Sequence, residues 1–289
     1  MDAIPDGNRA ISRKLPFVKL EGLGNCYLFI ERAHLARLKP AALARRFSDT
    51  ATGVGSDGLI VIDPLSEPVV LRIFNSDGSE AEMCGNGLRQ AALYLDIFAR
   101  RRKKQYMIAP PAGIFRARIL KSGRRSAIVE TELGKPQFSC KSVGLPGGGK
   151  AAFSIPLKVG RRQFMADCVS FGNPHAVVFV KDFGFDWITA GRYLADHRRF
   201  RNGANVHFVK IENRSLFHMR IYERGSGPTM ACGSGAAACL AAGAMRNYLA
   251  GKATAVMPGG KLSLEWDLKS GHVVQVGPAN LICVGELSI

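Results

Sequence analysis

The sequence has no long hydrophobic run. No stretch of about 18 uncharged apolar residues, the length that a membrane-spanning helix needs, occurs in the chain. The first segment, MDAIPDGNRAISRKLP, also has no apolar core of the kind found in secretory signals. We therefore expect a cytoplasmic protein with no membrane partner.

Cysteines with metal or redox spacing are missing as well. The seven cysteines are an odd number, are scattered along the chain, and form neither a CxxC pair nor the Cys/His spacing of a zinc site. This argues against a disulfide framework, a thiol–disulfide oxidoreductase and a structural metal, so we expect no metal. Some cysteines are then available as reactive thiols.

Acidic residues are scarce relative to basic ones, 23 against 40, which gives a formal charge of +17. Basic residues cluster at 100–104 and 197–201, but no aromatic-interleaved or zinc-finger pattern accompanies them. We expect a solvated basic surface rather than a nucleic-acid partner. Residues 1–14 are predicted to form a flexible basic arm.

The most informative feature present is an internal duplication. At a shift of 148 residues, Gly24–Asn25 aligns with Gly172–Asn173 and Cys84–Gly87 with Cys232–Gly235, with no gap between them. Strand-like segments recur at matching places, and each cysteine segment precedes an apolar, alanine-rich helical stretch. The sequence therefore predicts two copies of one α/β unit, related by a pseudo-twofold axis.

The repeat also suggests domain boundaries. A glycine-rich connection, LPGGGK, lies between the two copies. We place the first domain at residues 15–133, together with a C-terminal strand at about 279–289, and the second domain at 134–278.

Cys84 and Cys232 each stand at a glycine-rich entry into a helix. A helix start offers unpaired N–H groups and a positive dipole that bind a carboxylate, and the same field lowers the pKa of a cysteine placed there. Two such starts facing each other could hold one amino acid, with one thiolate removing the α-proton and the opposing thiol supplying a proton to the other face. Buried structural cysteines are the alternative, which the matched positions disfavour. A phosphate-binding glycine loop is another, but GxxxxGK[ST] is missing there.

Nearly the whole chain, from Phe17 to Ile289, resembles the diaminopimelate epimerase family. FVKLEGLGN, GVGSDGL, RIFNSDGSEAEMCGNGLR, FGNPH, NVHFV, RIYERGSGPTMACGSGAA and MPGG occur in the family's order and spacing. The resemblance implies an α/β (α+β) fold with two pseudo-symmetric domains, each a curved barrel-like sheet around a central helix, and an active site in the interdomain cleft. It implies cofactor-independent interconversion of LL- and meso-diaminopimelate, an amino acid as the small-molecule partner, and no cofactor. We also consider a homodimer.

The resemblance further implies a role for each site residue. Cys84 and Cys232 would be the two bases. The α-carboxylate would bind at the helix starts to Gly85, Asn86, Gly233 and Ser234. The remaining polar groups, including a distal carboxylate, would bind to Asn25, Asn75, Asn173, Asn205 and Arg224. Glu223 would bind the ammonium group and, with His175, tune the thiols. Without the family, His175 is as easily a turn histidine, Glu223–Arg224 a strand-end ion pair, and each asparagine a turn residue.

Two places depart from the usual family pattern. Cys26–Tyr27 follow Gly-Asn where Asp-Phe is usual, and Pro228 stands in place of a glutamate. Proline lacks a backbone donor, so we expect a reshaped distal pocket. A racemase of another amino acid, such as histidine or a diamino acid, therefore stays a second hypothesis, and a nucleic-acid-binding module on the same fold a third.

Overall fold

The computed structural model describes residues 13–99, 102–149 and 151–289. The predicted basic arm therefore lies outside the described residues up to residue 12, as do the first two residues of the basic cluster at 100–104. Lys14 is already part of the first strand. In the described ranges, no helix combines the length and the apolar character needed to span a membrane.

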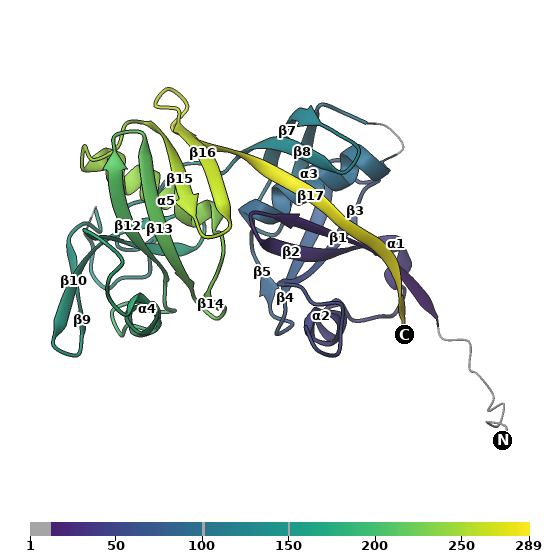
Figure 1. Cartoon of the computed structure of the whole chain (residues 1–289), viewed down its shortest axis with the longest axis horizontal. Helices are drawn as coiled ribbons and strands as arrows, with labels where there is room; N and C mark the ends of the chain where they lie inside the picture. The colour runs from purple at the N-terminus through teal and green to yellow at the C-terminus, as the bar shows by residue number, and fades with distance from the viewer. Residues whose placement is uncertain (1–12, 100–101, 150) are drawn as a thin grey trace, which may run out of the picture.

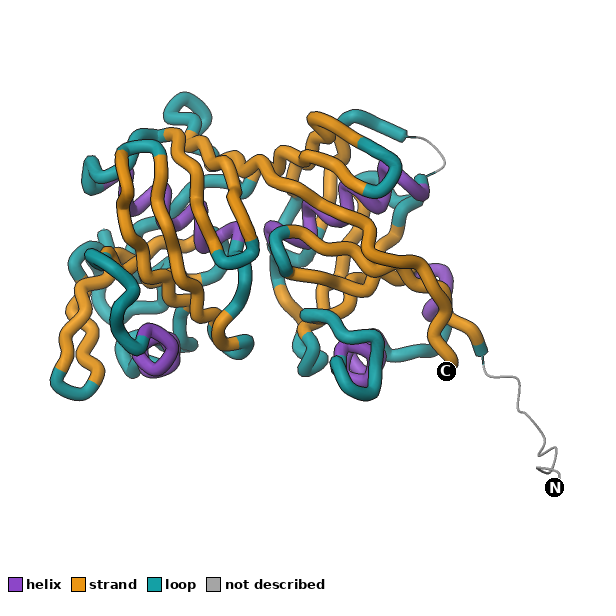
Figure 2. Tube along the Cα trace, viewed as in Figure 1, coloured by secondary structure: helices purple, strands orange, loops and turns teal. Residues whose placement is uncertain are grey.

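The first half of the chain forms a closed barrel of eight strands around one helix (Figures 1 and 2). In order around the barrel, the strands are β1 (Lys14–Gly22), β2 (Asn25–Glu31), β3 (Gly58–Asp63), β4 (Val69–Asn75), β6 (Gln105–Ala109), β7 (Phe115–Ser122), β8 (Ser126–Glu132) and the last part of β17 (Val273–Ser288). Inward aliphatic side chains pack on α3 (Gly85–Phe98), which is buried along almost its whole length. The short strand β5 (Glu80–Ala81) pairs with β4. Helices α1 (Arg32–Leu35) and α2 (Pro40–Ser48) cover the outer face of the sheet.

The second half repeats this arrangement. Its strands are β9 (Ile155–Val159), β10 (Arg162–Ser170), β11 (Pro174–Phe179), β12 (Asn205–Asn213), β13 (Leu216–Glu223), β14 (Gly227–Pro228), β15 (Lys252–Met257) and β16 (Gly260–Trp266), followed by the first part of β17. The alanine-rich helix α5 (Gly233–Met245) lies inside, because small side chains all round its first two turns let the sheet close around it. Helix α4 (Trp187–Ala195) packs on the outside. The predicted fold, two α/β barrels each with a central helix, is confirmed.

The two barrels exchange their closing strands. β8 and β17 pair antiparallel at the junction, from Ser126 with Asn280 to Glu132 with Val274. Beyond β8, the segment 133–137 hydrogen-bonds to Val273 and Ser170 and closes the second barrel. Beyond its pairing with β8, β17 pairs with β1 and closes the first, as its course across Figure 1 shows. The pseudo-twofold axis therefore passes between β8 and β17.

The sequence alignment indicated a repeat without gaps, but the structure shows that the alignment needs a gap. Tyr27 of β2 is paired with Gly58, and its counterpart His175 of β11 is paired with Asn205. Tyr27 and His175 are 148 residues apart, whereas Gly58 and Asn205 are 147 apart. The alignment without gaps therefore matches β3 to β12 out of register by one residue.

This slip changes which residues are equivalent inside the barrels. His207 becomes the counterpart of Ile60. Each of the two lies against the first-turn glycine of its central helix, Ile60 against Gly87 and His207 against Gly235.

Candidate functional site

Cys84 and Cys232 occupy equivalent positions at the starts of the two central helices. Each is the N-cap residue with an extended backbone, φ −140° at Cys84 and −135° at Cys232. The Cys84 Sγ accepts a hydrogen bond from the Gly87 N–H at 3.3 Å, which satisfies one of the free donors of the first turn. The N-cap backbone therefore fixes where each cysteine lies, and the Gly87 N–H also holds the Cys84 thiol.

A glutamine from β17 lies between the two helix starts. Gln275 is fully buried and donates to the Gly85 carbonyl at 3.2 Å and to the Thr131 hydroxyl at 2.8 Å. A Cβ at Gly85 would come within 2.8 Å of the Gln275 amide nitrogen, and one at Gly233 within 2.6 Å of its oxygen. Both glycines are therefore required by the close approach of one side chain.

A direct hydrogen bond also joins the two helix starts. Asn86, the second residue of α3, donates from Nδ2 to the carbonyl of Ala231 at 3.2 Å, and Ala231 precedes Cys232. Since α3 and α5 belong to different barrels, the two cysteines lie at the junction between the barrels.

Asn25 turns its carbonyl oxygen toward the first thiol. Its Nδ2 donates to Asp57 Oδ2 at 2.9 Å, and its Oδ1 lies 3.3 Å from Asn86 Nδ2 and 3.8 Å from Cys84 Sγ. Asp57 also accepts from the Cys26 N–H at 2.7 Å. The Asp57 carboxylate thus sets the orientation of the Asn25 amide.

A buried arginine supports the first helix start. Arg89 is fully buried and donates to Asn86 Oδ1 at 2.7 Å and to the Pro278 carbonyl at 3.2 Å. Burial lowers the pKa of Arg89 to about 10, which still leaves the guanidinium charged at neutral pH. A fixed positive charge therefore lies behind the first turn of α3.

The second barrel has a chain of three hydrogen-bonded side chains. His175 Nε2 lies 2.9 Å from Asn173 Oδ1, and His175 Nδ1 lies 2.9 Å from His207 Nε2. Burial lowers the pKa of His175 well below its usual value and that of His207 to about 3, so both rings are neutral. Nitrogens of both histidines and the Cys232 sulfur lie within 4.8 Å of one another.

Glu223 and Arg224 extend the site along the end of β13. Glu223 accepts from the Thr229 hydroxyl at 2.7 Å. The Arg224 N–H donates to Asn205 Oδ1 at 3.0 Å, and the Arg224 side chain is exposed. Ser234 Oγ lies 3.7 Å from Cys232 Sγ. The structure therefore gathers these predicted residues on one end of the second barrel.

Asn75 is bound differently from the other predicted site residues. Its Nδ2 donates to the Ser79 hydroxyl at 3.0 Å, within the turn between β4 and β5. The position corresponds to Glu223 in the repeat, so the two halves present different polar groups there.

The predicted lowering of the thiol pKa by the helix starts is wrong for this structure. Burial raises the pKa of Cys84, and the Gly87 N–H and the Tyr27 hydroxyl oppose this only in part. Burial, followed by the Glu223 carboxylate, raises the pKa of Cys232 well above its usual value. Burial also raises the pKa of Glu223. Desolvation of both thiols therefore outweighs the helix field.

Several contributors to this arrangement, Arg89 among them, were not predicted from the sequence. Asp57 stands in GVGSDGL, one of the segments that carry the resemblance, and could have been found there. His207 stands among buried apolar residues in the strand segment NVHFV, and a polar residue in an apolar strand is a weaker indication of a functional role. Gln275 lies far from every motif, and only the fold brings it between the helices.

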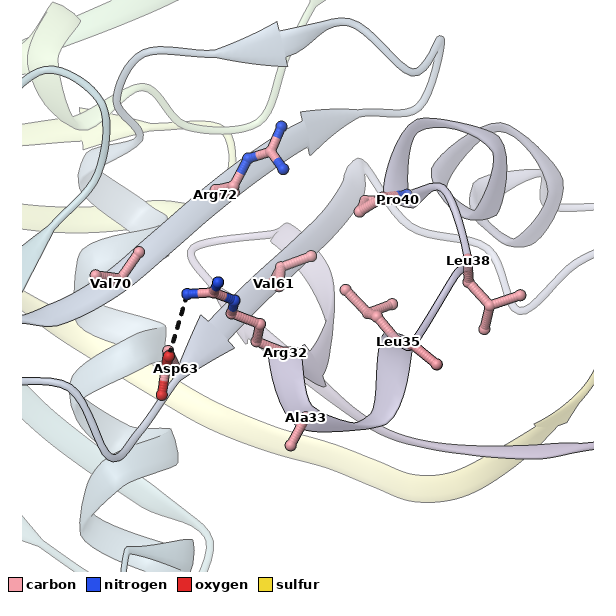
Figure 3. Close-up of a pocket in the computed structure, with 10 residues that line it drawn as sticks. Arg32, Ala33, Leu35, Leu38, Pro40, Val61, Asp63, Val70 and Arg72 are labelled. Carbon is pink, nitrogen blue, oxygen red and sulfur yellow. Dashed lines mark ion pairs between the residues drawn. The ribbon is translucent and has the colours of Figure 1, made fainter.

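A separate pocket lies on the outer side of the first barrel (Figure 3). Its volume is about 520 Å³, and it is lined by side chains of α1, β3 and β4. Arg32 and Asp63 face each other across it at 3.6 Å. It contains none of the predicted site residues.

Solved structures with the same fold include isomerases. The chain is similar to a PhzF-family phenazine biosynthesis protein of Bacillus anthracis, at 15% identity and a TM-score of 0.70, over 96% of this chain and 100% of that one. It is also similar to a hydroxyproline epimerase of Agrobacterium vitis, at 12% identity and a TM-score of 0.68, over 95% and 91% of the two chains. At these identities the likeness shows the fold alone.

The family model and the relatives define a protein of the racemase and epimerase class. The family model "Diaminopimelate epimerase" matches residues 17–139 and 167–282. Relatives named diaminopimelate epimerase are 36% identical in Moorella thermoacetica and 38% identical in Desulforudis audaxviator, each over 94% of this chain and 99% of the relative. The chain belongs to the diaminopimelate epimerase family of isomerases.

Proposed function

We propose that this protein interconverts LL- and meso-diaminopimelate by proton transfer between Cys84 and Cys232. The observation that carries the proposal is the placement of two thiols at equivalent helix N-caps on either side of the barrel junction. Relatives over nearly the full chain bear the name of this activity.

The substrate α-carboxylate binds at the two helix starts. The first residues of each helix, Gly85 and Asn86 in α3 and Gly233 and Ser234 in α5, carry N–H groups with no intrahelical acceptor. Two positive dipole ends and the buried charge of Arg89 favour an anion there.

The α-carbon then lies between the thiols. One thiolate takes the α-proton, so a C–H bond breaks as an S–H bond forms, and the thiol on the other face returns a proton to carbon. No oxidant or reductant is needed, because one proton leaves and one arrives. Glu223 binds the substrate ammonium, which offsets the carboxylate that raises the pKa of Cys232.

The distal end of the substrate is bound by polar side chains at the end of the second barrel. Arg224, held by its backbone contact to Asn205, takes the distal carboxylate in a bidentate fork. Asn25, Asn75 and Asn173 supply further hydrogen bonds, and His175, with Glu223, tunes Cys232.

The test is exchange of the α-proton. In D₂O, LL-diaminopimelate should acquire α-deuterium and convert to the meso form. Because lysine lacks the distal acid, kcat/KM should fall on the order of 10²–10³-fold with lysine as substrate. No deuterium in any amino acid tested would refute the proposal.

A racemase of another amino acid is the second candidate. Pro228 in β14 precedes Thr229, whose hydroxyl binds Glu223, so the departure lies next to the substrate-binding carboxylate. Higher kcat/KM for histidine, ornithine or lysine than for LL-diaminopimelate would establish this candidate and retain the two-thiol chemistry.

A further inference from the structure

His207 is a buried polar residue that the proposed reaction does not use. We propose that His207 is a positioning residue, which fixes the tautomer of His175 and through it the orientation of the Asn173 amide. The kinetic part of this inference rests on the proposed function, whereas the tautomer does not.

The order of the hydrogen-bond chain determines where each proton lies. Asn173 Oδ1 accepts only, so His175 must donate from Nε2 across their 2.9 Å contact. A neutral His175 then has a lone pair on Nδ1, and His207 must donate to it from Nε2 at 2.9 Å. His207 Nδ1 is left as a buried acceptor without a partner in the described part of the chain. The N–H donor of His207 thus determines the tautomer of His175 and, through it, the orientation of the Asn173 amide.

The equivalent place in the first barrel shows that packing alone does not require an imidazole. There Ile60 lies against Gly87, with its Cδ1 3.0 Å from where a Cβ would stand. In the second barrel the His207 ring lies against Gly235, and a Cβ on that glycine would come within 2.3 Å of the ring. An aliphatic side chain fills this place in one barrel, so the polar ring in the other serves hydrogen bonding.

The consequence is that the two asparagines present opposite groups. Asp57 holds Nδ2 of Asn25, which leaves its oxygen toward Cys84. His175 occupies the oxygen of Asn173, which leaves its Nδ2 as the donor. We infer that Asn173 donates to a substrate carboxylate oxygen, and that this donor is lost if the amide turns over.

A metal ion fits the same residues less well. The nearest nitrogens of His175 and His207 face each other at hydrogen-bond distance, 2.9 Å. To bind one ion, the lone pairs of the two nitrogens would have to point toward a common position away from the line between the nitrogens. We therefore interpret the two histidines near Cys232 as a hydrogen-bonded pair and not as metal ligands.

The direct test is long-range ¹H–¹⁵N NMR of the histidine rings in the full-length protein at pH 7.5. The wild type should show His175 and His207 each protonated on Nε2. In His207→Ile, which introduces the first-barrel residue, the His175 Nδ1 signal should move downfield as its donor is lost. His207→Gln retains an N–H and should restore much of the wild-type shift, and Ile60→Val serves as the packing control.

Kinetics supply the second readout. His207→Ile should raise KM for LL-diaminopimelate about tenfold, the effect of one lost hydrogen bond, while His207→Gln should stay within about threefold of wild type. Protonation of His175 on Nδ1 in the wild type would overturn the inference without any variant. An unchanged His175 spectrum and unchanged KM in a folded His207→Ile would also overturn it. Loss of α-proton exchange in the wild type would refute the proposed function instead and leave the tautomer result standing.

Discussion

At the scale of single residues, the two thiols differ although both cap a helix. Burial raises the pKa of Cys84, but the hydrogen bond from the Gly87 N–H and the nearby Tyr27 hydroxyl offset part of this rise. Cys232 lies beside the carboxylate of Glu223, which raises its pKa. In the free protein we therefore expect Cys84 to lose its proton at lower pH than Cys232.

Removing the Glu223 charge tests this asymmetry. The carboxylate raises the pKa of Cys232, so Glu223→Gln should lower that pKa and shift the alkylation of Cys232 by iodoacetamide to lower pH. The rate against pH can be followed by mass spectrometry of the Cys232 peptide. Glu286→Gln, at an exposed position, is the control. A midpoint that stays the same or rises in Glu223→Gln would contradict the assignment.

Replacing each thiol tests the division of labour. Cys84→Ala and Cys232→Ala should each reduce epimerisation at least ~100-fold, because one face of the α-carbon loses its acid or base. Cys283→Ser, on the β17 segment that pairs with β1, should keep the activity. Circular dichroism verifies folding, and a single alanine variant with near wild-type rate would refute the two-thiol mechanism.

Residues could be predicted where the repeat or a motif marked them. The paired cysteines and their glycines follow from the duplication, and Arg224 and Glu223 follow from the resemblance. Gln275, Arg89 and His207 depend on which side chains the closed barrels bring together. The direction of the thiol pKa could not be predicted, because it depends on burial that only the packed structure reveals.

At the scale of elements, the turn between β15 and β16 lies against the first barrel and against the segment before α5. Gly259, between β15 and β16, donates to the Met230 carbonyl at 2.8 Å, and Met230 lies two residues before Cys232. A Cβ at Gly259 would come within 1.8 Å of the Leu23 carbonyl, which belongs to the other barrel. A backbone atom cannot move aside as a flexible side chain can.

Gly259→Ala should therefore disturb both the barrel contact and the second thiol. We expect a loss of about 1–3 kcal/mol in the free energy of unfolding, as for other overpacked sites, together with reduced kcat. Urea unfolding and the epimerase assay measure the two effects. Gly148→Ala is the matched control, since a Cβ there meets no atom within 4 Å. Equal stability of the two variants would contradict the close contact.

The strands of the repeat and the two central helices could be predicted, whereas helices α1, α2 and α4 and the register of one strand could not. Alternating apolar residues indicate the strands, and alanine-rich runs indicate the central helices. The slip between β3 and β12 was missed because identical glycines on either side supported an alignment without gaps. Ile60 and His207 both point inward against a first-turn glycine of the central helix, which shows that these two residues are equivalent.

At the scale of the whole molecule, the first described residue, Arg13, lies beside Ile289. The Ile289 N–H donates to the Arg13 carbonyl at 3.0 Å, beside the pairing of β1 with β17. The two-barrel architecture could be predicted from the repeat, and a C-terminal strand was expected in the first domain, but the closing of the second barrel by residues 133–137 follows from the three-dimensional path. The domain boundaries, a cytoplasmic location and a homodimer stay predictions.

A circular permutant tests whether strand pairing, rather than chain order, defines the barrels. Joining the native ends and opening the chain between Gly147 and Gly148, where neither glycine has close neighbours, should retain folding and activity. Opening between Gly277 and Pro278, inside the β8–β17 pairing, should abolish both. Gel filtration and the epimerase assay distinguish the outcomes, and equal tolerance of the two openings would contradict the exchanged-strand arrangement.

The buried histidines predict how stability depends on pH. His175 and His207 have folded pKa values below the usual 6.5, so the unfolded chain binds more protons below that pH. The free energy of unfolding should therefore fall as the pH drops through 6.5, by about 1.4 kcal/mol per histidine between about pH 8 and about pH 5.5. Urea unfolding at the two pH values should show a smaller loss in His207→Ile than in wild type. His34→Gln, on the surface, should behave as wild type.

The strand that closes the first barrel is made long after the other strands of that barrel. Lys14 pairs with Ser288, so the first barrel stays open at one edge until the ribosome has passed residue 288. An unclosed sheet edge and the inner face behind it are then exposed on the nascent chain for most of translation. The first barrel should therefore complete its folding only after β17 has left the ribosome.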